Sequence, residues 1–501
     1  MSVPFSFIPS DLKVPLFYAE VDNSMASSGA AGALRRLIVA QVNDDADSPE
    51  IGSLVLVSRQ AEAVAIGGAG SMLATMFAAH RAIDVAGEVW CLPVKVAEGV
   101  AAKASVTVTG TVSAAGLVNL YVGGSRVRTT VTATMSAAAV AAAVAASVNA
   151  LPDLPVKASA TGDVLTLDAK FKGELGNDLR VEVNRLGRAN GEETPSGLQL
   201  ATTAMAGGVG SPDMAVVLAA LGDEPFEFCA QPWTDSDSLD AWKATMDENS
   251  GRWSWSKQLW GHVYSAKRGT LGQLVAFGRQ RNDPHMSVIG FEVGVPQPVW
   301  VVAAQVAART AVFISADPAR PTQTGTLPGI APAKSSERFM LTERQSLLSN
   351  GVGTAYFEGG YMRIQRAVTT YQKNAYGQPD DSYLDSEPLH QSAYVLRYLQ
   401  GIITSKYGRH KLANDGTAFG PGQAIVTPLV IRGELLAGYR HLETLGIAEN
   451  YDAFNANLVV ERDATNPNRI NVLYPPDLVN QLRVFALLYQ FRLQYATDAA
   501  A

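Results

Sequence analysis

Residues 259–293 read LWGHVYSAKRGTLGQLVAFGRQRNDPHMSVIGFEV, and this stretch decides the class of the fold. Leu259 to Ala266 is an apolar run of strand length, Thr270 to Gly278 has helical spacing, and Met286 to Val293 is a second apolar run. Apolar strands that alternate with helical stretches are typical of a mostly parallel sheet with helices on its faces. The stretch therefore predicts an α/β domain.

The same alternation continues on both sides of this stretch. Further strands are expected over 34–42, 88–94 and 226–230, and helices over 58–86, 212–221, 236–248 and 298–313. The first of these helices has a glycine-rich middle, Gly67-Gly68-Ala69-Gly70, which we interpret as close helix packing or a flexible bend. These elements together predict one discontinuous α/β domain, made of residues 29–99 and 208–335.

Between the two α/β pieces, over residues 100–207, the composition shifts to Val, Thr, Ala and Gly. An alanine-rich helix is expected over 134–149, and a hairpin over 157–170 that turns at Thr161-Gly162-Asp163. The other expected strands are 105–109, 117–122, 126–132 and 179–184, with a turn at Gly123-Gly124. A β-rich unit with one helix in this place is best interpreted as an inserted domain.

A different pattern follows Pro328-Gly329, and we assign residues 336–478 to a C-terminal α+β domain. Its expected elements are helices over 342–349, 389–407 and 428–445, a strand pair over 355–371, and final strands between 458 and 495.

Both ends of the chain are apolar and lack a helical pattern. Residues 2–23 contain Pro4, Pro9 and Pro15, and residues 468–495 form two apolar runs joined at Pro475-Pro476. Proline is excluded from helix interiors and biases the preceding residue toward extended backbone. An extended apolar segment that cannot bury itself favours the edge of another sheet. We therefore expect linking arms at residues 1–28 and 479–501.

Composition limits the possible functions. The chain has 501 residues, which is enough for about two to four domains. Its net charge of −7 gives no electrostatic reason to expect nucleic-acid binding, and we expect no nucleic-acid partner. The N-terminus lacks the pattern of a secretory signal, and the longest apolar stretch noted, 136–150, is too short to span a bilayer, so we expect no membrane insertion and a cytosolic product. Cys91 and Cys229 lie in apolar runs and are expected to be buried free thiols.

The sequence does not contain the common catalytic motifs, and we expect no cofactor, metal or catalytic residue. There is no Gly-Lys-Ser or Gly-Lys-Thr, and none of the six histidines forms an HExxH motif. No Gly-x-Ser-x-Gly elbow is present. Ser265 lies near His262 and Asp283 in sequence, but a strand would place His262 and Ser265 on opposite faces.

Two groups of side chains leave alternatives open. Five tryptophans lie within 233–260, and we favour packing over stacking on sugars or bases because Trp253 and Trp255 share one face if the stretch is extended. A basic run, Lys406, Arg409, His410 and Lys411, ends a predicted helix. It is explained equally well by cations at a helix C-terminus or by a docking patch for an acidic partner.

A collinear set of segments carries a resemblance to a known family. IPSDLKVPLFYAEVDNS at residues 8–24, the run 261–285 with GHVYSA, RGT and RNDPH, and NPNRINVLYPPDLVNQLRVFALLYQFRLQ at residues 466–494 resemble the tail sheath protein of contractile-tailed, Mu-like bacteriophages. The resemblance spans most of the chain and is weakest between about residues 103 and 207. It implies an α/β sheath domain with an inserted β-rich domain, a C-terminal α+β domain facing the tail tube, and extended terminal arms.

The resemblance also implies roles for particular residues. Family members give their terminal segments to the sheet of a neighbouring subunit, and the flexible stem 24–32 would let subunits rotate while linked. The side chains expected to anchor the two arms are Phe5, Phe7, Ile8, Val14, Leu16 and Phe17, and Leu482, Val484, Phe485, Leu487, Phe491 and Leu493. The residues expected to face the tube are Lys406, Arg409, Lys411, Arg432 and Arg440.

The function that follows from the resemblance is mechanical. Subunits would stack as six-fold rings around an inner tail tube, with baseplate and tail terminator proteins as further partners, after assembly in the host cytoplasm. Contraction would drive the tube through the host cell envelope, using energy stored in the lattice. The alternatives are an α/β hydrolase-like or nucleotide-binding enzyme and a glycan-binding virion protein.

Overall fold

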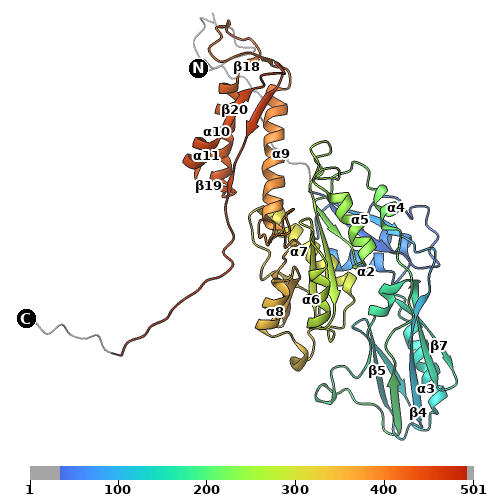
Figure 1. Cartoon of the computed structure of the whole chain (residues 1–501). Helices are drawn as coiled ribbons and strands as arrows, with labels where there is room; N and C mark the ends of the chain where they lie inside the picture. The colour runs from blue at the N-terminus through green and yellow to red at the C-terminus, as the bar shows by residue number, and fades with distance from the viewer. Residues whose placement is uncertain (1–33, 494–501) are drawn as a thin grey trace, which may run out of the picture.

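The computed structural model describes residues 34–493, which form a central α/β body, an inserted β-rich domain and a C-terminal unit (Figure 1). The insert and the C-terminal unit lie at opposite ends of the elongated molecule, and a long C-terminal segment runs away from the body. The N-terminal arm and the stem 24–32 lie outside the described residues. The mixed α/β and α+β class is confirmed.

A nine-stranded sheet forms the centre of the body, in the order β14-β16-β15-β13-β12-β11-β1-β3-β2. The six strands from β15 to β3 run parallel, whereas β14, β16 and β2 pair antiparallel at the two edges. The strands are β1 (Arg36–Gln41), β2 (Val55–Leu56), β3 (Val89–Val94), β11 (Phe228–Ala230), β12 (His262–Arg268), β13 (Met286–Phe291), β14 (Thr326–Leu327), β15 (Gly353–Glu358) and β16 (Tyr361–Arg366). Every residue of β1 and β13 is buried, because helices cover both faces.

Alternation along β1 assigns the helices to the two faces of the sheet. Ile38 shares a core with Phe77 of α2 and Trp300 of α7, whereas Leu37 packs with Leu218 of α4 and Trp242 of α5. The helices of the body are α1 (Gln60–Gly67), α2 (Met72–Arg81), α4 (Met214–Ala219), α5 (Ser236–Met246), α6 (Leu271–Arg279), α7 (Val299–Ala316) and α8 (Leu341–Leu348). Helix α7 is long and apolar enough to cross a membrane, but 12 of its 18 residues are buried in this core.

The helix expected over 58–86 is two helices. Gly68 and Gly70 separate α1 from α2 and have φ of +88° and +74°, a region that favours glycine. A Cβ at Gly70 would collide with the carbonyl oxygen of Leu154 in the insert. Both interpretations of these glycines therefore apply: they allow the chain to bend between α1 and α2, and they allow the backbone of the insert to approach closely.

The insert consists of a four-stranded sheet (β10-β4-β8-β7) and a three-stranded sheet (β6-β5-β9), with α3 packed against both. Its elements are β4 (Ala101–Gly110), β5 (Gly116–Val122), β6 (Ser125–Val131), α3 (Ala137–Asn149), β7 (Val156–Thr161), β8 (Val164–Lys172), β9 (Val181–Val183) and β10 (Leu198–Thr202). Both expected hairpins are present, with positive φ at Gly123, Gly124 and Gly162. Strand β10 was not predicted.

The C-terminal unit packs around its own core, which includes Leu435, Tyr439 and Phe454. Its elements are α9 (Glu387–Tyr407), β17 (Lys411–Leu412), β18 (Ile425–Val426), α10 (Pro428–Thr444), β19 (Ala448–Glu449), α11 (Tyr451–Asn457), β20 (Val459–Arg462), β21 (Ile470–Leu473) and β22 (Asp477–Leu478). The expected boundary at residue 336 is corrected, because β15 and β16 are strands of the nine-stranded sheet and the unit begins only at α9.

Candidate assembly surface

The segment after β22 is the most exposed apolar part of the described chain. We expected strands up to residue 495, but residues 479–493 form no strand within this chain and run away from the body (Figure 1). Eight large apolar side chains are between 67% and 96% exposed: Leu482, Val484, Phe485, Leu487, Leu488, Tyr489, Phe491 and Leu493. All six side chains predicted for the C-terminal arm are among them. A single chain has no reason to display such a row unless another surface covers it.

The side chains of this segment alternate in a way that suits a strand. In extended backbone, Phe485, Leu487, Tyr489, Phe491 and Leu493 lie on one face. The other face is apolar from residue 484 to 488 and becomes polar at Gln490 and Arg492. One face is therefore suited to burial along its whole length, and the other over its first half.

The root of this segment is held firmly, in contrast to its exposed part. Strand β22 pairs antiparallel with β19, and the carbonyl oxygen of Val479 accepts a hydrogen bond from Gln391 Nε2 at 3.0 Å. Gln323 Nε2 donates to the carbonyl oxygen of Leu482 at 2.9 Å. The segment leaves the body at a defined point and in a defined direction.

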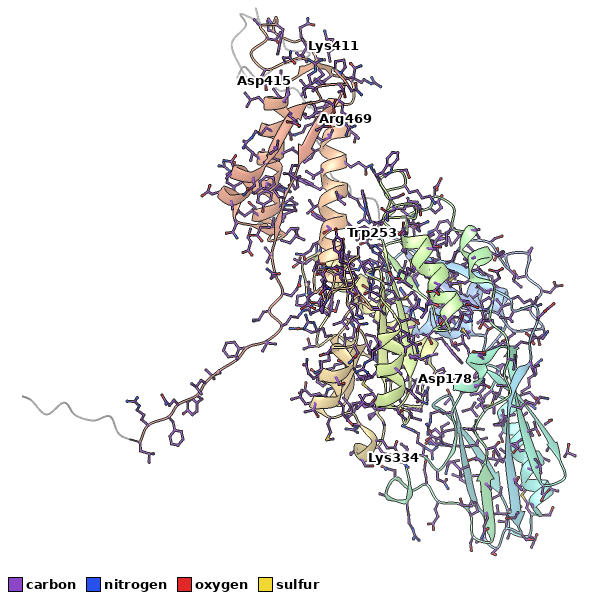
Figure 2. The ribbon with its side chains drawn as sticks, viewed as in Figure 1. Asp178, Trp253, Lys334, Lys411, Asp415 and Arg469 are labelled. Carbon is purple, nitrogen blue, oxygen red and sulfur yellow. The ribbon has the colours of Figure 1, made fainter. Side chains whose placement is uncertain are left out.

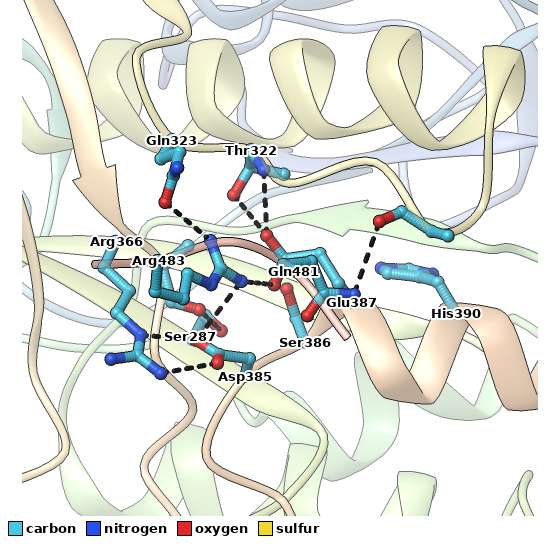
Figure 3. A network of polar contacts seen from close by, with 12 residues as sticks. Ser287, Thr322, Gln323, Arg366, Asp385, Ser386, Glu387, His390, Gln481 and Arg483 are labelled. Atoms are coloured by element: carbon cyan, nitrogen blue, oxygen red, sulfur yellow. Dashed lines mark hydrogen bonds and ion pairs between the residues drawn. The ribbon is translucent and has the colours of Figure 1, made fainter. Parts of the chain in front are cut away.

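A buried charge network surrounds this exit point (Figure 3). Arg483 Nη2 lies 3.0 Å from Glu387 Oε2 and 3.5 Å from Asp385 Oδ1. Asp385 also accepts two hydrogen bonds from Arg366 of β16, at 2.8 and 2.7 Å, and these bonds raise the pKa of Arg366. The backbone N–H and the hydroxyl of Thr322 donate to Glu387 Oε1 at 2.9 and 2.8 Å. The network joins the segment, the start of α9 and the edge of the central sheet.

A second buried network fixes α9 to the parallel strands. His390 Nδ1 lies 2.6 Å from Glu227 Oε1, and His390 Nε2 lies 2.8 Å from the hydroxyl of Tyr264. Arg397 forms an ion pair with the other oxygen of Glu227. Burial favours a raised pKa for Glu227, but Arg397 and His390 outweigh it and hold the pKa below its ordinary value. Burial raises the pKa of Tyr264. Helix α9 and the strands therefore form one rigid connection.

The residues considered for catalysis do not form a catalytic site. His262 Nε2 lies 2.9 Å from Ser287 Oγ, and Ser265 is buried on the opposite face of β12, as expected. Within residues 34–493 no group of His, Cys, Asp or Glu has the arrangement of a metal site. Both cysteines are buried and free, as predicted, and burial raises the pKa of Cys229 to about 12.

The tryptophans are packing residues, with one exception. Trp233, Trp242 and Trp260 are buried, and Trp253 stacks on His285 at a ring distance of 4.5 Å (Figure 2 labels Trp253). Trp255 is 84% exposed and does not pack within this subunit. The cause is local, because residues 251–257 form turns rather than the extended backbone that would place both side chains on one face.

Comparison with known proteins decides the family. Residues 207–370 match the phage tail sheath protein central domain, and residues 378–492 match the phage tail sheath C-terminal domain. The chain is 40% identical to the Mu-like prophage FluMu tail sheath protein of Haemophilus influenzae over 495 residues, which cover 98% of this chain and 100% of that protein. The chain belongs to the phage tail sheath family. The resemblance stated from the sequence is confirmed, and so is the prediction of a structural sheath subunit of a contractile tail.

Solved structures of sheath proteins are similar in outline. The sheath tail protein of Desulfitobacterium hafniense aligns with a TM-score of 0.49 and 11% identity, covering 94% of this chain and 97% of that one. The sheath tail protein of Listeria innocua gives 0.48 and 12%, covering 91% and 95%. The sheath of an extracellular contractile injection system in its contracted state gives 0.48 and 9%, covering 97% and 99%.

The residues predicted to face the tube lie in the C-terminal unit of this sheath protein, and most of them contact neighbouring side chains. Lys406 pairs with Glu434 at 2.6 Å, and Arg432 donates to Asn455. The guanidinium of Arg440 lies 4.3 Å from the ring centroid of Tyr451. Arg409 is exposed, and Lys411 lies at the far end of the unit (Figure 2). Lys411 Nζ donates to Gln423 Oε1 at 3.3 Å. Both Arg409 and Lys411 are exposed, and they remain candidates for contact with a partner.

Proposed function

We propose that this sheath protein polymerises by donating residues 484–493 to a sheet of a neighbouring copy. The observation that carries the proposal is the exposed apolar segment on a fixed root. Ten extended residues reach about 33 Å. Donation of one segment to the next copy is a head-to-tail contact, and such contacts generate rings or helices.

The acceptor in this proposal is the two-stranded sheet β20–β21. Its strands pair antiparallel from Val459↔Leu473 to Arg462↔Ile470, and no third strand joins them among the described residues. A two-stranded sheet is marginal alone, and its open edges offer backbone N–H and C=O groups to an incoming strand. Val459, Val472 and Leu473 remain between 43% and 61% exposed beside these edges. The N-terminal arm, which lies outside the described residues, is proposed as a second donated strand.

The subunits would form stacked six-fold rings around an inner tail tube, with the C-terminal unit inward. Arg409 and Lys411 are then the leading candidates for contact with the tube protein. The insert would face outward, because it lies at the other end of the molecule from the C-terminal unit (Figure 1). We assign it residues 100–207, between the two parts of the central body.

The proposed action is contraction without a chemical fuel. The family is structural and the sequence contains no Walker lysine motif, so the energy is assigned to the assembled lattice, which falls from an extended state to a better-packed one. Baseplate and tail terminator proteins are the proposed partners at the two ends. Assembly in the bacterial cytoplasm and passage of the tube through the host envelope complete the proposal.

The first test is negative-stain electron microscopy of the full-length protein, alone and with its tube protein. Striated tubes are expected from the full chain in at least one condition. Deletion of residues 484–501, or of the N-terminal arm 1–28, should leave a folded subunit that forms no tubes. Normal tubes from both truncations would refute donation as the basis of assembly.

A further inference from the structure

The C-terminal segment has one buried charge just before its long exposed part. The side chain of Arg483 is 12% exposed, whereas its neighbours Leu482 and Val484 are 70% and 77% exposed. Strand β22, Val479, Leu482 and Arg483 all contact their own subunit. Residues 477–483 therefore form the root that this subunit holds.

The charges at this boundary depend on one another. Two cations, Arg366 and Arg483, face two carboxylates, Asp385 and Glu387. Arg366 pairs directly with Asp385, and Arg483 supplies the one direct ion pair that Glu387 makes within residues 34–493. Glu387 has no exposed side-chain surface. Withdrawal of Arg483 would leave this buried carboxylate with only the longer-range attraction of Arg366, which is unfavourable.

We infer that Arg483 positions the arm, because it latches the arm to its own subunit and makes residue 483 the fixed point from which the donated strand leaves. The inference rests on the proposed function only for what the arm does beyond residue 483. A pull on the strand passes through the guanidinium of Arg483 to Asp385 and Glu387 at the start of α9. From Asp385 it passes through Arg366 into β16, and so into the nine-stranded sheet.

The network also fixes the direction of exit. Arg483 Nη1 donates to Gln323 Oε1 at 3.4 Å, while Gln323 Nε2 donates to the carbonyl oxygen of the preceding residue, Leu482. Gln481 Nε2 contacts Gln391 Oε1 at 3.2 Å on α9. Three consecutive residues are thus held from two sides (Figure 3). Any change in arm direction between two assembled states is then confined to residue 484 and beyond.

Limited trypsin digestion of the full-length, unassembled subunit tests the latch. Cleavage after Arg492 releases LQYATDAAA (493–501), and cleavage after Arg483 releases VFALLYQFR (484–492). Trypsin must take the arginine side chain into its pocket, so the ion pair protects the bond after Arg483. We expect cleavage after Arg483 to be at least roughly tenfold slower in the folded subunit than in a synthetic peptide of residues 478–488, because the peptide lacks the ion pair.

Matched variants separate the latch from a general loss of structure. Glu387→Gln keeps the size of the side chain and its contact with Thr322, and should raise the rate of cleavage after Arg483 about tenfold or more relative to the wild-type subunit. Arg483→Lys keeps the charge and a trypsin site but loses the planar guanidinium, and should give an intermediate rate. Glu461→Gln, at an exposed carboxylate of β20, should leave the rate of cleavage after Arg483 unchanged.

The outcomes are distinct for the latch and for the proposed function. The latch would be overturned if the bond after Arg483 were cleaved as fast in the wild-type subunit as in the peptide. It would also be overturned if Glu387→Gln did not change the rate of this cleavage while circular dichroism shows a folded protein. In assembled tubes, protection after Arg492 tests donation instead. A subunit with a protected Arg483 whose tubes leave residue 492 open would retain the latch and refute the donated strand.

Discussion

The double substitution Phe485→Ala and Phe491→Ala tests assembly through the C-terminal segment most directly. Both rings lie on the face of the segment that is apolar throughout, and they are 79% and 67% exposed in the subunit. Complete burial of one phenylalanine stabilises by about 1.5–3 kcal/mol, and alanine keeps only a small part of this. Because the two rings are already partly buried in the free subunit, the two substitutions together should weaken each contact between subunits by about 3 kcal/mol. This corresponds to roughly a 100-fold rise in the critical concentration for assembly.

Light scattering and sedimentation over a concentration series measure this critical concentration. The melting temperature of the unassembled subunit should not change, because neither ring packs in the core of the subunit. Tyr376→Ala is the matched control, since this aromatic side chain is 88% exposed but lies in a loop of the central body. A critical concentration within threefold of the wild-type value for the double variant would refute the assignment of this face to the interface.

Three further predictions concern the folded subunit. Burial lowers the pKa of His80 to about 3, so between about pH 6.5 and 3 the unfolded chain binds a proton that the folded chain does not, and the free energy of unfolding decreases as the pH falls, by up to about 1.4 kcal/mol per pH unit. In urea titrations at pH 7 and 4.5, His80→Leu should lose less of this free energy than the wild type. Equal losses would contradict the assignment. Gly70→Ala should lower the free energy of unfolding by more than the about 1–3 kcal/mol that a left-handed backbone costs by itself, because the new Cβ would collide with the carbonyl oxygen of Leu154. Gly52→Ala is the control, since Gly52 has a φ of +83° but open space around it, so this variant shows the backbone effect alone. Equal shifts in the thermal unfolding of the two variants would rule out the collision. Trp255→Ala should change the free energy of unfolding by less than about 0.5 kcal/mol, and a larger loss in denaturant titration would show that the exposed ring is packed in solution.

The sequence predicted those parts of the fold that short-range patterns determine. The unit β12-α6-β13 follows from residues 259–293, because strand and helix periods change at Thr270, a side chain that caps the helix by accepting a hydrogen bond from the N–H of Gln273. The hairpin turns of the insert follow from Gly123-Gly124 and Gly162, where positive φ is required. In each case the deciding residues lie within a few positions of the structure that they determine.

The exit network could not be predicted, because it joins residues that are distant in the chain. Arg366 and Arg483 are separated by 117 positions (483 − 366), and neither lies in a recognisable motif. One signal was available: Arg483 is a single charge inside an apolar run and has to find a partner or reach water. Glu227, between Phe226 and Phe228, carries the same signal on a buried strand. The pattern indicates that a partner exists but cannot identify it.

The placement of β15 and β16 escaped prediction for a related reason. A strand pair followed by helices has the pattern of an α+β domain, and only the tertiary structure shows that β15 pairs parallel with β13. Because β13 was already predicted as a buried parallel strand, it needed a neighbour on each side. One neighbour is β12, and an edge position would have left half of its backbone groups unpaired in a buried strand.

The distribution of apolar side chains on the two faces of the C-terminal segment indicates how much of each face must be buried in the polymer. A strand added beside β20–β21 would place one face toward the core that Val460 and Ile470 join, and the other beside Val459 and Leu473, which are 46% and 61% exposed. Residues 484–488 are apolar on both faces, so a sheet with one solvated face would leave half of these side chains in water. Further protein surface must therefore pack on the outer face of the completed sheet over residues 484–488. The polar side chains of Gln490 and Arg492 mark where this cover ends, because from there only the inner face remains apolar.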